Sequence, residues 1–124
     1  MNNDEDIIEI PLRPLVWMGD SLKNIRSFPE EVRASVGYAL QLVQAGETLM
    51  DAKPFKRVGS GVYEIVKRYD TDTYRAVYAV KIGEQIYVLH AFQKKSKQGI
   101  KTPQADIELI KQRYKDAVAR EKQQ

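Results

Sequence analysis

Residues 74–80 read YRAVYAV, residues 86–92 read IYVLHAF, and the basic run KKSK follows at 94–97. Both apolar runs are rich in β-branched and aromatic residues, and a glycine-containing turn lies between them. This pattern predicts two strands joined by a short loop. Arg75 lies inside the first run, and the lysines follow the second. A cationic site on a small sheet suits a phosphate backbone, so this stretch predicts contact with nucleic acid.

The strands of this sheet follow one another closely. Short turns separate the strands expected at 62–69, 74–82 and 85–92, which favours an antiparallel meander. Residues 15–18 form a short apolar run that ends at a glycine and predicts a first strand. The sheet should therefore contain at least four strands.

Three helices are expected around this sheet. A short one begins at Asp20 or Ser21, a second begins at Pro29 and ends at Gly46, and a third opens at Thr102-Pro103. The order is strand, two helices, three strands and a helix. This order predicts an α+β fold, in which a mainly antiparallel sheet has its helices packed on one face.

Composition indicates one domain without disulfides or membrane spans. The chain has 124 residues, no cysteine, one histidine and a net charge of +3. A leader at 1–13 is acidic, where a secretory signal would be basic, and a single domain follows at 14–120. The lack of cysteine excludes a thiolate zinc site and fits a cytoplasmic protein. We expect no metal, cofactor or membrane partner.

Alternation along the strands places Glu64, Arg68 and Arg75 on the open face of the sheet. Arginine is unusual in the middle of such a strand, and two interpretations of Arg75 remain. It forms an ion pair with Glu64 or Asp72, or it presents a guanidinium to a phosphate. Glu64 is correspondingly a general base or only the partner of Arg75.

Three further side chains are candidates for the site. Lys94 and Lys95 lie just past the last strand, where they either reach the open face or belong to a solvated turn. His90 falls in mid-strand among apolar residues. A packed, hydrogen-bonded histidine is favoured over a catalytic one at such a position.

Several motifs in order make the chain similar to the RelE/HigB superfamily of type II toxin–antitoxin toxins. They are LVW at 15–17, GDS at 19–21, FPEEVR at 28–33, YRAVY at 74–78 and HAFQKKS at 90–96. The resemblance covers nearly the whole chain and is greatest to the phage-derived HigB-like branch. It implies a RelE-like, microbial-ribonuclease-type fold.

The resemblance implies a metal-independent mRNA interferase. Such toxins cleave mRNA, usually on the ribosome, by attack of a 2′-OH on the adjacent phosphate, and a helix-turn-helix antitoxin restrains them. By this resemblance Arg75 stabilises the phosphate, and Lys95 or Lys94 acts near the leaving group. Relatives carry a lysine pair at the positions of Glu64 and Val66, so the general base here would be Glu64 or His90. Expected RNA-binding residues are Lys56, Lys67, Arg68, Lys97 and Lys101.

Two other functions fit the same pattern. One is a ParE-like toxin that poisons DNA gyrase on the same scaffold. The other is a catalytically inactive module that binds RNA or a partner. Fold alone does not separate these functions, because all three can use one scaffold.

Overall fold

A five-stranded sheet forms the centre of the computed structural model, which describes residues 11–94 and 101–123. The strand order is β1-β5-β4-β3-β2, and only the β1–β5 pair is parallel. The predicted α+β class and mainly antiparallel sheet are therefore confirmed. The strands are β1 (Leu15–Trp17), β2 (Lys53–Pro54), β3 (Val62–Tyr69), β4 (Asp72–Ala79) and β5 (Ile86–Lys94).

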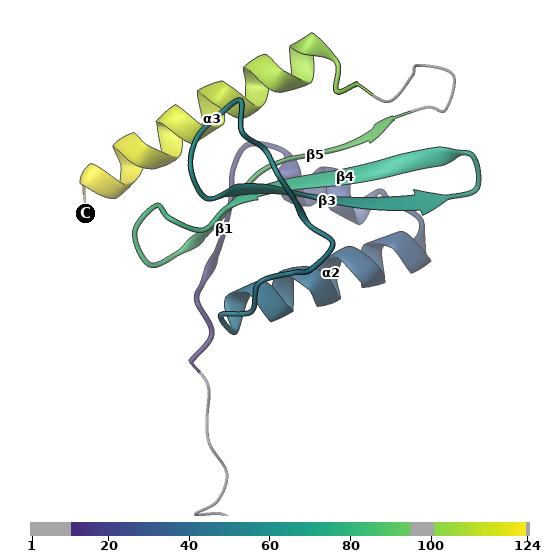
Figure 1. Cartoon of the computed structure of the whole chain (residues 1–124), viewed down its shortest axis with the longest axis horizontal. Coiled ribbons are helices and arrows are strands. Elements are labelled where there is room, and N and C mark those ends of the chain that lie inside the picture. Colours follow the sequence, from purple (N-terminus) through teal and green to yellow (C-terminus); the bar gives the residue numbers. More distant parts are fainter. Residues whose placement is uncertain (1–10, 95–100, 124) are drawn as a thin grey trace, which may run out of the picture.

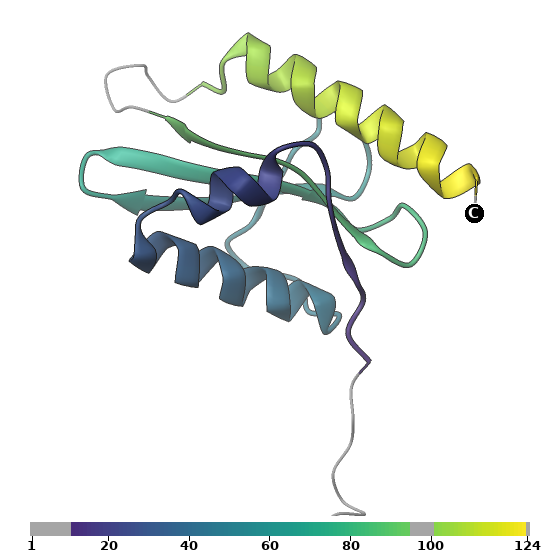
Figure 2. The same ribbon diagram turned by 180° about the vertical axis from the view of Figure 1, so that it is seen from behind.

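Helices cover both faces of this sheet. The helices are α1 (Ser21–Arg26), α2 (Glu30–Gln44) and α3 (Gln104–Lys122). Figures 1 and 2 show α2 on one side of the sheet and α3 on the other. Two separate apolar clusters lie between the layers, one under α1 and α2 and one under α3. The expectation that all helices pack on one face was wrong.

Strand β4 shows the physical reason. Ala76 and Tyr78 belong to the cluster under α2, and the alternating residues Val77 and Ala79 belong to the cluster under α3. All four side chains are at most 2% exposed. A strand that is apolar on both of its sides needs cover on both, and α3 provides the second cover.

The connection between α2 and β3 carries the chain from one face to the other. It begins on the α2 side, where Leu49 packs on the first cluster, and it reaches the α3 side, where Phe55 belongs to the second. Figure 1 shows this segment passing around the β3 edge of the sheet. The short strand β2, which was not predicted from the sequence, pairs with β3 along that edge. None of the helices in the described ranges is long and apolar enough to cross a membrane.

The end of α2 follows the expectation for Gly46. This glycine has a φ of +93°, and its amide donates a hydrogen bond to the Val43 carbonyl. The amide of Glu47 donates to the Leu42 carbonyl. Together these two bonds form a Schellman motif, which ends the helix with a residue in the left-handed region.

Gly46→Ala should destabilise the protein by about 1 kcal/mol, because an L-residue is strained at this φ. A Cβ at Gly46 would meet no atom within 4 Å, so the cost isolates backbone strain. Gly37 is the matched control, since it lies inside α2 and a Cβ there also meets open space. Gly37→Ala should stabilise by about 1 kcal/mol through helix propensity. Urea unfolding of both variants measures this, and equal signs would contradict the assignment.

Candidate active site on the α3 face of the sheet

Three neighbouring strands bring most of the predicted catalytic residues to one face. Val66 of β3 pairs with Arg75 of β4, and Arg75 pairs with Phe92 of β5. Glu64 and Lys94 lie two residues from Val66 and Phe92, so their side chains share the face of Arg75. This is the face that α3 partly covers.

Arg75 and Glu64 form a largely buried ion pair. The Arg75 Nη1 atom donates a hydrogen bond to Glu64 Oε2 at 3.0 Å, and the two side chains are 12% and 7% exposed. The expected open face is therefore wrong for these two residues. The sequence left two interpretations of Arg75, and the ion pair with Glu64 that one of them includes is observed. Burial strengthens the attraction between the two charges and makes loss of one partner costly.

Lys94 lies beside this pair, within β5 rather than after it. Its side chain is only 2% exposed, and Nζ has no hydrogen-bond partner among the described residues. Desolvation lowers the pKa of Lys94 from its ordinary 10.5, the charge of Arg75 lowers it further, and the charge of Glu64 opposes both. An ammonium group in this position is a better proton donor than an exposed lysine.

A β-bulge directs His90 towards α3. Val77 pairs with His90 and Tyr78 pairs with Val88, so Leu89 is an extra residue in β5. Leu89 packs in the α3 cluster, and the next side chain, His90, also contacts α3. Counted forward from Leu89, strict alternation would have placed His90 on the opposite face. A bulge commonly redirects a side chain in this way.

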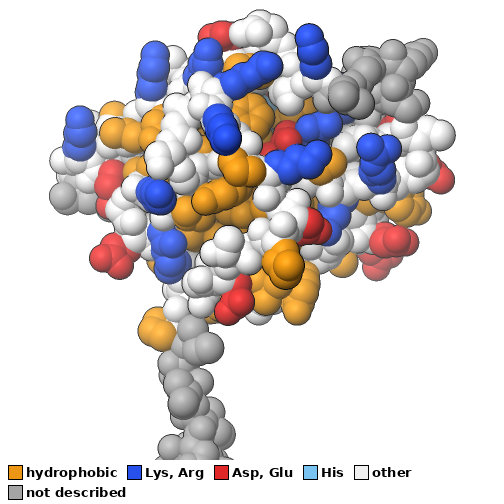
Figure 3. Space-filling view, viewed as in Figure 1, with side chains coloured by type: hydrophobic (Ala, Val, Ile, Leu, Met, Phe, Trp, Pro, Cys, Tyr) orange, Lys and Arg blue, Asp and Glu red, His pale blue; other side chains and the backbone are white. Residues whose placement is uncertain are grey.

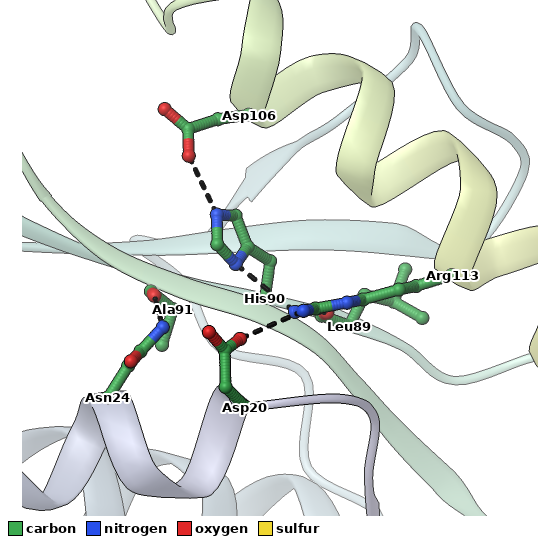
Figure 4. A network of polar contacts seen from close by, with 7 residues as sticks. All are labelled: Asp20, Asn24, Leu89, His90, Ala91, Asp106 and Arg113. Carbon is green, nitrogen blue, oxygen red and sulfur yellow. Dashed lines mark hydrogen bonds and ion pairs between the residues drawn. The ribbon is translucent and has the colours of Figure 1, made fainter.

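His90 is part of a polar network that joins α1, β5 and α3 (Figure 4). Its Nε2 lies 2.7 Å from Asp106 Oδ1, and its Nδ1 lies 3.3 Å from Arg113 Nη1. His90 is 4% exposed, and its ring stacks on Phe92 with ring centroids 4.9 Å apart. This is the packed, hydrogen-bonded environment that the sequence favoured over a catalytic one.

Arg113 extends the network to the start of α1. It donates to the Leu89 carbonyl at 3.0 Å and to Asp20 Oδ1 at 2.8 Å. The hydrogen bond from Arg113 lowers the pKa of Asp20. Gly19 makes this approach possible, because a Cβ there would overlap the Arg113 guanidinium. From the sequence, Asp20 was expected as a helix cap and as part of the GDS motif, whereas the contacts of Arg113 and Asp106 were not predicted.

The predicted RNA-binding residues fall in different places. Lys67 pairs with Tyr74, which belongs to the cluster under α2, so Lys67 is on the face opposite Arg75. Arg68 is exposed on the Arg75 side near the β3–β4 turn. Lys56 and Lys101 are exposed and line one common groove. Lys95 and Lys97 lie outside the described residues.

Within residues 11–94 and 101–123, no group of three or more histidine or acidic side chains could hold a metal ion. The candidate groups for chemistry that this sheet face brings together are an arginine, a carboxylate and a lysine. Together they can bind an anion, accept a proton and donate a proton.

Replacing Glu64 and Arg75 tests the energetic coupling of the buried pair. Glu64→Gln and Arg75→Gln should each destabilise by about 1–3 kcal/mol, because each leaves a covered charge without its counter-charge. The double variant should recover about 1–3 kcal/mol relative to the sum of the single changes. Urea unfolding of the four proteins gives the coupling energy.

The control for this cycle is the Glu108–Lys111 pair on the outer side of α3. Its atoms are 3.9 Å apart, and its side chains are 62% and 43% exposed. The same cycle there should give a coupling below about 0.5 kcal/mol. Equal coupling for the two pairs would refute the special role of burial at Arg75.

Comparison with known proteins agrees with this fold. The family described as phage-derived protein Gp49-like matches residues 23–115. No curated protein matches the chain. A free-state variant of E. coli toxin RelE with two arginines replaced by alanine superposes with a TM-score of 0.53 and 21% identity, covering 88% of this chain and 97% of that chain. The isolated E. coli RelE toxin gives a TM-score of 0.52 and 22% identity, covering 81% and 97%.

These identities are too low to transfer an activity, but they establish the common fold. The expected RelE-like fold and the expected phage-derived family are both confirmed. Because the family match spans most of the sequence, the chain belongs to the phage-derived Gp49-like family.

Proposed function

We propose that this chain is the toxin of a type II toxin–antitoxin system and that it cleaves mRNA on the ribosome without a metal. The observation that carries the proposal is the meeting of Arg75, Glu64 and Lys94 on one desolvated sheet face. A phosphate clamp, a base and an acid are the groups that RNA cleavage by an internal nucleophile requires. The proposed site of action is the cytoplasm, and the proposed partner is a helix-turn-helix antitoxin.

The proposed reaction balances with these three groups alone. The 2′-oxygen attacks the adjacent phosphorus, and the bond from phosphorus to the 5′-oxygen of the next nucleotide breaks. A base takes the proton of the 2′-OH, and an acid gives a proton to the leaving 5′-oxygen. The products are a 2′,3′-cyclic phosphate and a free 5′-hydroxyl. Arg75 would hold the phosphate oxygens on which negative charge accumulates.

Lys94 is the proposed acid. Its lowered pKa favours release of its proton, and its position beside Arg75 keeps it near the bound phosphate. By the resemblance, Lys95 was the first candidate for this role, but Lys95 lies outside the described residues. Burial of Lys94 supports the choice, because a covered ammonium without a fixed partner among the described residues retains its hydrogen-bonding capacity for a substrate.

Glu64 is the proposed base. Both ring nitrogens of His90 already contact α3 side chains, so His90 has no free nitrogen for a substrate proton. The Glu64 carboxylate lies 3.0 Å from Arg75 and therefore close to any phosphate that the guanidinium binds. Glu64 is largely buried against Arg75. A substrate phosphate therefore has to compete with the Glu64 carboxylate for the Arg75 guanidinium.

That competition favours one alternative function. Glu64 partly neutralises the charge of Arg75 and so weakens the stabilisation that Arg75 could give to a transition state. Such a pair would suit a module that binds RNA without cleaving it. The two functions differ in whether the phosphodiester bond breaks, so one cleavage assay separates them.

The function is tested with purified protein, ribosomes and a translated mRNA. Primer extension should reveal discrete cuts, and the upstream fragments should end in 2′,3′-cyclic phosphates. Arg75→Lys is the matched inactive variant, because it keeps the charge near Glu64 but loses the bidentate fork. Its cleavage rate should fall about 100- to 1,000-fold. Cleavage should persist in excess chelator, provided that controls confirm intact ribosomes.

Intact mRNA together with DNA breaks at gyrase sites would replace this proposal by gyrase poisoning. RNA binding without any cleavage would favour the inactive module. Full activity of a folded Arg75→Lys protein would contradict the proposed need for the bidentate guanidinium of Arg75.

Lys94→Met tests the cost and the use of the buried lysine. It should lower the cleavage rate about 100-fold or more by removing the acid. It should also stabilise the protein by up to about 1 kcal/mol at neutral pH, because an apolar side chain of similar length carries no desolvation penalty. Lys115→Met, at an exposed position of α3, is the control and should change neither quantity appreciably.

The same variant gives a pH test with a defined sign. Because the folded-state pKa of Lys94 is lowered from 10.5, the unfolded chain binds more protons between the two pKa values. The free energy of unfolding should therefore rise with pH in that window for the wild type relative to Lys94→Met. Urea titrations across neutral to alkaline pH measure the difference. A flat difference would show that Lys94 has an ordinary pKa.

A further inference from the structure

A groove lies at the β2 edge of the sheet, since Pro54 of β2 is among the residues that line it. Its volume is about 300 Å³. It is formed by two segments far apart in the sequence, the connection before β3 and the start of the segment leading into α3. The lining residues are Pro54, Phe55, Lys56, Arg57, Lys101 and Thr102.

The groove combines an apolar floor with a cationic rim. Phe55 is 8% exposed and packs into the α3 cluster, so it is a fixed apolar floor, and Pro54 also lines the groove. Lys56, Arg57 and Lys101 are all exposed. Figure 3 shows lysine and arginine side chains spread over the α3 half of this face. An apolar floor suits a base or ribose, and the cations suit phosphates on both sides of it.

Strand pairing connects the groove to the proposed active site. Lys53 pairs with Glu64, and the Phe55 amide donates a hydrogen bond to the Val62 carbonyl at 2.8 Å. Lys53 and Phe55 are two residues apart and therefore share the face of Glu64. A line of positions runs from Arg75 through Glu64 and Lys53 to the groove. Adjacent nucleotides of one extended strand can follow such a line.

We propose that this groove binds a nucleotide of single-stranded RNA that neighbours the scissile phosphate. The proposal rests on the proposed ribonuclease function and adds a subsite to it. Single-stranded RNA fits better than an acidic peptide, because the floor offers an apolar surface to a base and the cations surround it. The groove would position the strand and contribute binding energy without taking part in bond breaking.

The test measures binding of an RNA that cannot be cleaved. The probe is a fluorescent single-stranded 2′-O-methyl oligonucleotide, which lacks the attacking hydroxyl, and anisotropy is recorded at several salt concentrations. The triple variant Lys56→Ala/Arg57→Ala/Lys101→Ala should bind about 10- to 100-fold more weakly than wild type. The slope of log affinity against log salt concentration should become shallower by about 2, since each lost phosphate contact on a single strand contributes about 0.7.

A matched variant removes the same charge elsewhere. Lys115→Ala/Arg120→Ala/Lys122→Ala lies on exposed positions of α3 and lowers the net charge equally. It should keep affinity within about threefold of wild type. Circular dichroism and thermal melting confirm that both triple variants are folded. Equal weakening by both variants would overturn the subsite, because it would indicate only a general attraction of RNA to a basic protein.

The outcome separates the subsite from the proposed catalysis. Specific loss of RNA binding in the groove variant supports the subsite even if the wild type fails to cleave mRNA. Normal cleavage together with unchanged RNA binding by the groove variant overturns the subsite and leaves the proposed function intact. Unchanged RNA binding with selective loss of poly-glutamate binding would assign the groove to an acidic protein partner and overturn the RNA subsite.

Discussion

The packing of α3 against β5 is the interaction on which the candidate site depends. Ile107 and Ile110 of α3 are at most 2% exposed and share a cluster with Leu89. This contact covers a sheet face that also holds charged groups. Cover lowers the local dielectric, so it strengthens the ion pair of Arg75 with Glu64 and disfavours the charged form of Lys94. The polar network around His90 also joins α3 to β5 and to the start of α1, so it helps to fix the position of α3 on the sheet.

The site retains charges where apolar residues would pack at lower cost. A buried lysine without a fixed hydrogen-bond partner in the described part of the chain works against folding. Folded proteins tolerate such costs mainly at functional sites, where the strained or desolvated group takes part in binding or chemistry. The burial of Lys94 is therefore stronger evidence for a functional site than an exposed basic cluster would be, because exposed lysines are common on any soluble protein.

Most strands and helices could be predicted because their periods are local properties of the sequence. β3 matched the expected residues 62–69, and Gly46 ended α2 as its conformational freedom indicates. The second covered face could also have been inferred, since Val77 and Ala79 alternate with equally apolar neighbours. The bulge at Leu89 could not, because an extra residue in one strand depends on its partner strand. The contact of Asp20 with Arg113 joins residues 93 positions apart, and no local pattern encodes it.

The resemblance predicts a lysine at position 64, and the residues around Glu64 explain how a carboxylate is accommodated there. Arg75 contacts Glu64 directly, and Lys53 pairs with it across the β2–β3 edge. Lys94 contributes a third positive charge that acts on the same carboxylate. The cations thus come from three other strands, and the region stays electropositive although β3 itself supplies an acid. In the proposed mechanism such a site attracts a phosphate and keeps beside it a carboxylate oxygen that accepts a proton.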